Sequence, residues 1–238
     1  MFHFKHFSLY HEHSTLKIGT DSVLLAAAIP LQPAHNVLDI GCGCGIIAYS
    51  LAWRLSAFKE EQHFTGIDID ESSILEARHN LEIFPSYQGQ HFLFEQCSVQ
   101  QWAAHHHDSY DLIVTNPPYF GDSLKPDRTD RQLSKHRDNT LSFSDLANSV
   151  CHLLSADGCF FLILPPEEMK EFHQLALQQA LHLIFQSEIR PSPSKPIHRI
   201  ISGYSRHTQP FTTTQLTIHN ATGGFSEEYR NHTKDFYL

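Results

Sequence analysis

Four consecutive residues have the chemistry to hold a planar amine: Asn116, Pro117, Pro118 and Tyr119. The side-chain oxygen of Asn116 and the carbonyl of Pro117 can each accept a hydrogen bond from one N–H of an exocyclic amine. Two consecutive prolines stiffen the direction of that carbonyl, and Tyr119 offers a face on which a base can stack. The nitrogen lone pair can then attack the methyl carbon of a sulfonium in line. We therefore predict that the four residues are catalytic; the competing interpretation is a proline turn that ends a strand.

A glycine-rich loop lies upstream, directly after an expected buried strand at residues 36–40. Asp39 precedes Gly41, Gly43 and Gly45 in this loop. Glycines let the backbone turn sharply and approach a ligand closely. Their spacing is G-x-G-x-G, which differs from the G-x-G-x-x-G pattern of dinucleotide-binding enzymes. An acid just before the loop suits a ligand with an amino group better than an anionic pyrophosphate.

A second acid ends the next expected strand, at residues 63–68. Asp68 follows Gly45 by 23 positions, and an acid at this place can accept both ribose hydroxyls of an adenosine. Its alternative role is that of a capping acid at a strand–helix junction. Together with the glycine loop, Asp68 predicts an adenosine-containing cofactor at the carboxyl ends of the strands. Because Asn116 follows the fourth strand, at residues 110–114, it should lie at the same edge of the sheet.

Apolar runs alternate with helix-like segments along the whole chain, which predicts an α/β fold with a mostly parallel sheet and helices on both faces. We expect a Rossmann-like sheet of seven strands with one late antiparallel strand, in one domain over residues 1–238. The expected strands are residues 36–40, 63–68, 91–94, 110–114, 159–164, 182–189 and 199–204, and residues 215–219 are a possible further strand. The expected helices are residues 46–57, 71–82 with Asp70 as N-cap, 141–154, and one opened by Pro165 and Pro166 that runs to about residue 180. The polar stretch at residues 121–140 is expected to be a functional loop.

The composition argues against a membrane protein and against a protein coated in positive charge. The net charge is −9 with histidine counted as neutral, and no apolar run approaches the roughly 20 residues that span a bilayer. The N-terminus lacks the pattern of a signal peptide. The five cysteines fit no disulfide or zinc pattern, so reduced thiols are expected. We predict a soluble, cytoplasmic protein, with a monomer favoured.

A run of three histidines, at residues 105–107, is the one candidate for metal binding. No nearby cysteine or carboxylate pattern completes a site, so a solvated surface turn is the simpler interpretation. We expect no metal ion.

In order and spacing, the glycine loop, Asp68 and residues 116–119 resemble class I methyltransferases that methylate amino groups. DNA adenine methyltransferases, ribosomal RNA guanine methyltransferases and enzymes that methylate glutamine in release factors share these motifs. Two terminal segments, residues 2–21 and 225–238, further resemble the bacterial tRNA(Val) adenine-N6 methyltransferase family, which modifies adenosine 37 next to the anticodon. The resemblance covers nearly the whole chain and implies S-adenosylmethionine as cofactor and tRNA as substrate.

The resemblance also implies roles for individual residues. Residues 1–35 would cover the cofactor, and residues 17–21, with Lys17, Gly19 and Thr20, would lie over its methionine part. The glycine loop would line the amino-acid and ribose portion, and Asp68 would hold the ribose. Relatives commonly place an acid against the adenine where this chain has Ser98, which is a weaker acceptor.

An acidic protein that binds RNA needs positive charge somewhere on its surface. The loop after the reaction motif supplies some of it, and the stretch at residues 189–226 supplies more because it contains no acid. We predict that both lie on the RNA-facing side, and the alternative is that these residues are merely solvated. The target base must leave the stack, which an unpaired anticodon loop makes easy. The candidate RNA-binding residues are Lys125, Arg128, Arg131, Arg199 and Arg206.

Two other functions stay open from the sequence. A protein glutamine methyltransferase uses the same four residues, but it usually has an additional helical N-terminal domain, whereas 35 residues precede the first strand here. A non-catalytic RNA-binding relative is the other alternative, and the intact residues 116–119 argue against it. A nicotinamide-dependent enzyme does not fit the glycine spacing.

Overall fold

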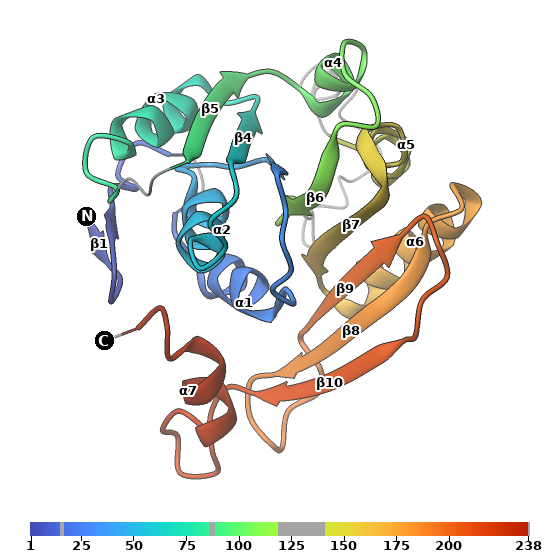
Figure 1. Cartoon of the computed structure of the whole chain (residues 1–238). Helices are drawn as coiled ribbons and strands as arrows, with labels where there is room; N and C mark the ends of the chain where they lie inside the picture. Colours follow the sequence, from blue (N-terminus) through green and yellow to red (C-terminus); the bar gives the residue numbers. More distant parts are fainter. Residues whose placement is uncertain (15–16, 86–88, 119–140, 238) are drawn as a thin grey trace, which may run out of the picture.

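A single large sheet forms the centre of the computed structural model, which describes residues 1–14, 17–85, 89–118 and 141–237 (Figure 1). Its strands are β3 (Asn36–Ile40), β4 (Gln62–Asp68), β5 (Gln90–Gln96), β6 (Tyr110–Thr115), β7 (Leu154–Leu164), β8 (His182–Arg190), β9 (Arg199–Ser205) and β10 (Thr212–Thr217). Their spatial order is β10-β8-β9-β7-β6-β3-β4-β5. A separate short hairpin pairs β1 (Phe2–His3) with β2 (Ser8–Leu9).

The sheet is mostly parallel, as expected for the predicted α/β fold. Strand β3 pairs in parallel with both β4 and β6, and β9 runs antiparallel between β7 and β8. Within the described residues the sheet has eight strands, and not the seven that were expected. The added strand is β10, which pairs in parallel with β8 along its whole length.

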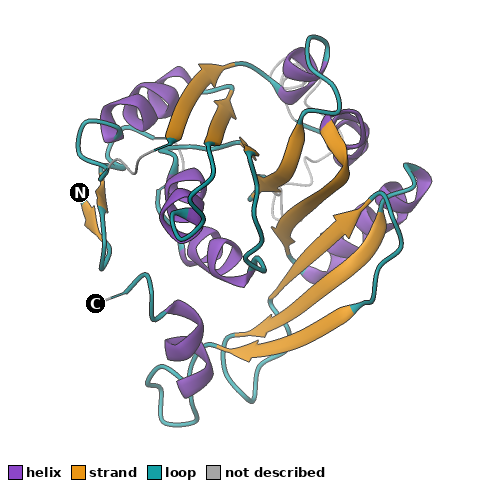
Figure 2. Ribbon diagram, viewed as in Figure 1, coloured by secondary structure: helices purple, strands orange, loops and turns teal. Residues whose placement is uncertain are grey.

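Helices cover both faces of the sheet (Figure 2). Alternate residues of β7 belong to two different hydrophobic cores: Phe161 and Ile163 face one, and Phe160 and Leu162 face the other. This alternation is the period of two that a strand imposes on its side chains. The first core takes in α1 (Thr20–Ala28), α2 (Ile46–Leu55), α3 (Glu71–Asn80) and α7 (Glu227–Thr233). The second takes in α4 (Val99–Ala103), α5 (Phe143–Leu153) and α6 (Pro166–Gln178).

Side-chain caps decide where several helices begin. Asp70 accepts a hydrogen bond from the amide of Ser73, which confirms it as the N-cap of α3, and Ser142 caps α5 in the same way. Residues 157–158, between the expected helix at 141–154 and the expected strand at 159–164, lie within β7. There the register of β7 with β6 is irregular, since Leu154 pairs with Tyr110 while Cys159 pairs with Leu112.

The two ends of the chain lie against each other (Figure 1). The amide of Lys5 donates to the carbonyl of Phe236 at 2.8 Å, and the rings of Phe4 and Phe236 are 6.4 Å apart. Phe236 also meets Trp53 of α2 edge to face. The N-terminal segment is therefore packed between the core and the last residues of the chain. Within the described ranges, no helix has the length and apolar character to cross a membrane.

Candidate active site

The glycine loop turns over the end of β4 and leaves open space above it. Gly41, Gly43 and Gly45 have φ values of 68°, 55° and 87°, a region that other residues rarely adopt. A Cβ added to Gly41 or Gly43 would meet nothing within 4 Å, whereas one on Gly45 would lie 2.7 Å from the ring of Tyr49. Gly45 is therefore needed for packing, and the other two face a space that a ligand can enter.

Asp39 is fully buried beneath this loop. Its Oδ2 accepts a hydrogen bond from the amide of Ala48 at 3.0 Å, but its Oδ1 has no partner among the residues described. Burial raises the pKa of Asp39 to about 7; the bond from Ala48 lowers this pKa and the nearby charge of Asp68 raises it. A buried acceptor without a partner is unfavourable, and a ligand ammonium group would satisfy it. This buried acceptor fits the ligand amino group that the sequence predicts.

Asp68 joins the end of β4 to the glycine loop. Its Oδ2 accepts from the amide of Gly43 and its Oδ1 from the amide of Asp70, each at 2.9 Å. A carboxylate has about four acceptor positions, so each oxygen can take a further hydrogen bond from a ribose hydroxyl. The N-cap of α3 is Asp70, and the contact of Asp68 with a ribose stays a prediction.

Ser98 lies close to Asp68 along the edge of the sheet, since the amide of Cys97 donates to the carbonyl of Asp68 at 3.0 Å. The Ser98 hydroxyl donates to the side chain of Gln101 and accepts from the Gln101 amide, both at 3.2 Å. The bond from the Gln101 amide, together with one from the Ser98 backbone amide to Gln101 Oε1 at 3.0 Å, forms a capping box for α4. The Ser98 oxygen is therefore engaged at the start of this helix, and its contact with a cofactor adenine stays a prediction.

The reaction motif and the glycine loop lie side by side. Ile40 pairs with Thr115 in the register of β3 and β6, so the next residues, Gly41 and Asn116, leave the same sheet edge as neighbours. The Thr115 hydroxyl donates to the carbonyl of Ile40 at 2.8 Å and fixes this register. Pro117 is buried and Pro118 is exposed, and Tyr119 lies outside the described residues.

The side chain of Asn116 is oriented by a residue that the sequence did not suggest. Asn116 Nδ2 donates to the hydroxyl oxygen of Ser22 at 3.1 Å. Ser22 lies in the first turn of α1 and is 7% exposed. With Nδ2 directed at Ser22, Oδ1 of Asn116 is left to accept a bond from a substrate.

The start of α1 brings the predicted N-terminal residues to the same edge. Gly19 is the N-cap residue of α1, and Thr20 is its first residue and is exposed. Lys17 is exposed, and its ammonium donates to the carbonyl of Glu12. Their contacts with a cofactor stay predictions, and Gly19 and Thr20 lie within three residues of Ser22, which contacts Asn116.

Glu76 of α3, a second residue that the sequence did not suggest, anchors the segment that leads to α1. Its Oε1 accepts from the amides of Glu12 and His13 at 2.6 and 3.0 Å, and its Oε2 accepts from the amide and hydroxyl of Ser14. Burial would raise the pKa of Glu76, but these hydrogen bonds hold it below its usual value. Glu76 is 4% exposed, so this carboxylate stabilises the N-terminal segment from inside.

The two candidate RNA-binding arginines that the structure describes are not brought together. Arg199 begins β9 next to the end of β7, on the same edge as Asn116, while Arg206 follows the other end of β9. A strand of this length separates them by about 20 Å. Both are ion-paired: Arg199 with Asp21 at 2.7 Å, and Arg206 with Asp108 at 2.7 Å. The other three candidates, Lys125, Arg128 and Arg131, lie outside the described residues.

The histidine run packs as a surface turn. The ring of His106 stacks on that of Trp102 with centroids 4.0 Å apart, and His105 and His107 are exposed. In the parts of the chain that the structure describes, no three His, Cys, Asp or Glu residues gather as a metal site. All five cysteines are free thiols, as expected.

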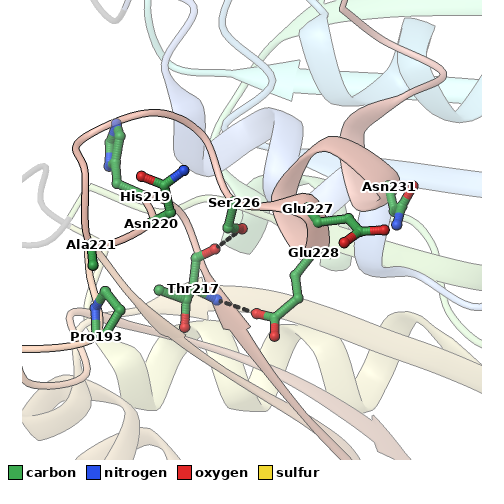
Figure 3. A pocket seen from close by; sticks show the side chains of 9 residues that line it. All are labelled: Pro193, Thr217, His219, Asn220, Ala221, Ser226, Glu227, Glu228 and Asn231. Carbon is green, nitrogen blue, oxygen red and sulfur yellow. Dashed lines mark hydrogen bonds between the residues drawn. The ribbon is translucent and has the colours of Figure 1, made fainter.

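A polar pocket of about 410 Å³ lies elsewhere, at the end of β10 beside α7 (Figure 3). Glu228 accepts from the amide of Thr217 at 3.2 Å, and Ser226 donates to the carbonyl of Thr217, so these side chains fasten α7 to β10. Four strand steps separate β10 from β6, which amounts to about 19 Å. The pocket therefore lies at the same carboxyl edge of the sheet as Asn116 but four strands away from it along that edge.

Comparisons with known proteins agree with this geometry. The methyltransferase small domain model matches residues 8–142. Proteins from Yersinia pseudotuberculosis serotype O:3 (strain YPIII) and Yersinia pestis (strain Pestoides F), both named tRNA1(Val) (adenine(37)-N6)-methyltransferase, are 35% identical over 237 residues. The match covers 100% of this chain and 92% and 93% of theirs. A solved structure of a predicted O-methyltransferase from Agrobacterium tumefaciens has a TM-score of 0.67 at 18% identity, covering 91% of this chain and 96% of that one, which supports the fold.

The resemblance inferred from the motifs and the chain ends is thereby confirmed. The family model spans more than half of the chain, and the named relatives match it from end to end. This chain belongs to the methyltransferase small domain family and, within it, to the family of the tRNA1(Val) (adenine(37)-N6)-methyltransferases.

Proposed function

We propose that this protein transfers a methyl group from S-adenosylmethionine to N6 of an adenine in tRNA, at adenosine 37 of tRNA(Val). The observation that carries the proposal is the register of Ile40 with Thr115, which sets Asn116 beside the glycine loop. A methyl acceptor held by Asn116 would therefore lie next to a cofactor held by the loop. The names of the full-length relatives supply the identity of the nucleotide.

The cofactor site would be built from the edge of β3 and β4. Asp39 would accept from the ammonium group of the cofactor, and Asp68 would accept from its ribose hydroxyls. Gly41 and Gly43 leave room for the ligand, since no atom lies within 4 Å of an added Cβ. Residues 1–35 would cover the cofactor, with Lys17, Gly19 and Thr20 over its methionine part, and Ser98 would lie near its adenine. When bound, S-adenosylmethionine supplies a methyl carbon made electrophilic by its sulfonium.

The substrate amine would be held by acceptors only. Asn116 Oδ1 and the carbonyl of Pro117 each accept from one N–H of N6, and Tyr119 stacks on the base. The nitrogen lone pair then forms a bond to the methyl carbon while the carbon–sulfur bond breaks and its electron pair stays on sulfur. The methylated nitrogen releases one proton to solvent. No residue needs a shifted pKa for this step, because the protein contributes orientation and dipoles.

The RNA would lie along the edge that holds Asn116. Residues 121–140 form a substrate loop in this proposal, and Lys125, Arg128 and Arg131 contact phosphates. Arg199 is at this edge, but its pairing with Asp21 and its 13% exposure support a role in holding α1. Arg206 lies at the opposite edge of the sheet, so we do not include it among the residues that would contact RNA. We also propose that the protein is a monomer of one domain in the cytoplasm, which is consistent with a tRNA substrate.

The test is to incubate the protein with methyl-labelled cofactor and total RNA from cells that lack this gene. Mass spectrometry of the digested RNA should find the label as N6-methyladenosine in one tRNA loop. Label in a release factor, with none in RNA, would replace the proposal with glutamine methylation. Cofactor binding without any transfer would support a non-catalytic RNA-binding protein.

A further inference from the structure

The side chain of Asn116 has two nearly identical ends, and only one of them can accept a hydrogen bond. Rotation of the amide by half a turn would present N–H groups to the N–H groups of a substrate amine, which repel them. The reaction proposed above therefore requires something that fixes the amide. In the structure the one contact of its nitrogen, among the described residues, is with the Ser22 hydroxyl at 3.1 Å.

We propose that Ser22 is a positioning residue that holds the acceptor end of Asn116 toward the substrate. This inference rests on the proposed function, because it assigns Ser22 a part in the same reaction. In this role Ser22 acts through Asn116, the residue that its hydroxyl contacts. The Ser22 hydroxyl oxygen can accept from Nδ2, and the contact in the structure has this direction.

Ser22 is itself held firmly, which a positioning group requires. It is 7% exposed, and the following residues Val23 and Leu24 are each 1% exposed in the core. The preceding residue, Asp21, accepts from Nε of Arg199 at 2.7 Å, and Arg199 is 13% exposed. The first turn of α1 is thus tied to β9 on one side and to Asn116 on the other.

Because Ser22 in the first turn of α1 is buried, loss of the bond between Ser22 and Asn116 should affect the orientation of the Asn116 amide. Asn116 is half-buried, so an Nδ2 group without Ser22 would lack a partner and the amide would lose its preferred orientation. A fraction of the molecules would then present the wrong end to the substrate. The chemical step should slow, while the cofactor site on β3 and β4 stays intact.

The kinetic test compares Ser22→Ala with a matched control, Ser149→Ala. Ser149 lies on α5 in the second core and is 6% exposed, so its removal also deletes a buried helical hydroxyl. We expect the single-turnover rate of Ser22→Ala on tRNA to fall about tenfold. Its affinity for S-adenosylmethionine by calorimetry should stay within twofold, and Ser149→Ala should match wild type in both. A wild-type rate in Ser22→Ala, or a fall in rate matched by an equal fall in cofactor affinity, would overturn the proposal.

A second measurement needs no RNA. The side-chain amide of Asn116 can be assigned in a ¹⁵N-correlation NMR spectrum as the signal that Asn116→Ala removes. Ser22→Ala should shift one of its two proton signals, and Ser149→Ala should leave both in place. An unchanged signal in Ser22→Ala would refute the contact. If wild-type protein methylated no tRNA, the proposed function would fail, and this spectrum would still decide whether Ser22 holds Asn116.

Discussion

The two halves of the sheet hold their polar groups in different ways. Around β3 and β4, carboxylates lie at the glycine loop: the half-buried Asp68 accepts from the Gly43 amide, and the buried Asp39 keeps one oxygen without a partner among the described residues. In the half formed by β8, β9 and β10, the outermost strand β10 has mostly exposed side chains. The first half therefore resembles a preformed ligand site, and the second a scaffold whose polar contacts fasten elements together. Changes in the first half should alter chemistry and cofactor binding, whereas changes in the second should alter stability.

The largest effect on turnover should come from a change at Asn116, which lies between the two halves of the sheet. Asn116→Ala removes one of the two proposed acceptors for the substrate amine, so turnover should fall about a thousandfold or more. Cofactor affinity by calorimetry should remain within about threefold, because the bonds of Asp39 and Asp68 are untouched. Retained turnover in this variant would disprove the mechanism.

A pair of glycine substitutions compares the two halves directly. Gly45→Ala places a Cβ 2.7 Å from the ring of Tyr49 at a φ of 87°, so the free energy of unfolding should fall by about 2–3 kcal/mol. Gly223→Ala has a similar φ of 88° but nothing within 4 Å, and should lose only about 1 kcal/mol. Urea unfolding measures both, and equal losses would contradict the packing argument.

Cofactor affinity should depend on pH through the carboxyl group of Asp39. Burial raises the pKa of Asp39 to about 7, above its usual 3.8. The folded protein therefore keeps a proton between about pH 4 and 7 that the unfolded chain has released, and Asp39 makes stability fall as pH rises through this window. An ammonium ligand needs the ionised carboxylate, so affinity for S-adenosylmethionine should rise roughly tenfold between about pH 5.5 and 7.

Asp39→Asn serves as the control for that pH dependence. The amide keeps the shape of the side chain and does not titrate, so the affinity of this variant should be low and flat over the same range. A slope equal to that of wild type would assign the titration to another group.

The smallest effect should be on RNA binding at the far edge of the second half. Arg206→Glu reverses a charge that pairs with Asp108, about 20 Å along β9 from the edge that holds Asn116. Its tRNA affinity, measured by filter binding at low salt, should stay within twofold of wild type. Arg128→Glu, in the proposed substrate loop, should weaken binding roughly tenfold. Equal weakening in both variants would place RNA on both edges.

The sequence predicted the first half well because its signals are local. The strand at residues 36–40, the glycines that follow it and the cap at Asp70 all depend on neighbours a few residues away. Parallel strands alone imply that residue 116 lies at the same edge of the sheet as the glycine loop. The register of Ile40 with Thr115 confirms this expectation.

The sequence failed where a contact joins distant segments. Ser22 and Asn116 are 94 positions apart, and Glu76 reaches the amide of Ser14 across 62 positions. Nothing in the local pattern of either residue indicates its partner. Strand β10 was placed too late because its residues at 212–214 are exposed threonines without an apolar alternation. Arg199 and Arg206 were predicted to lie on one side because the linear sequence does not show that β9 separates them and carries them to opposite edges of the sheet.

The contact between the two ends of the chain has a consequence for synthesis on the ribosome. The amide of Lys5 bonds to the carbonyl of Phe236, and His232 lies against the carbonyl of Leu24 in α1. Translation makes Lys5 and α1 before residues 232–236. The segment that carries Ser22 thus gains this support only after α7 has emerged. A nascent chain without α7 would have the glycine loop and the contact of α1 with β9 but would lack the contact of His232 with α1, so methyl transfer should begin only after α7 has been made.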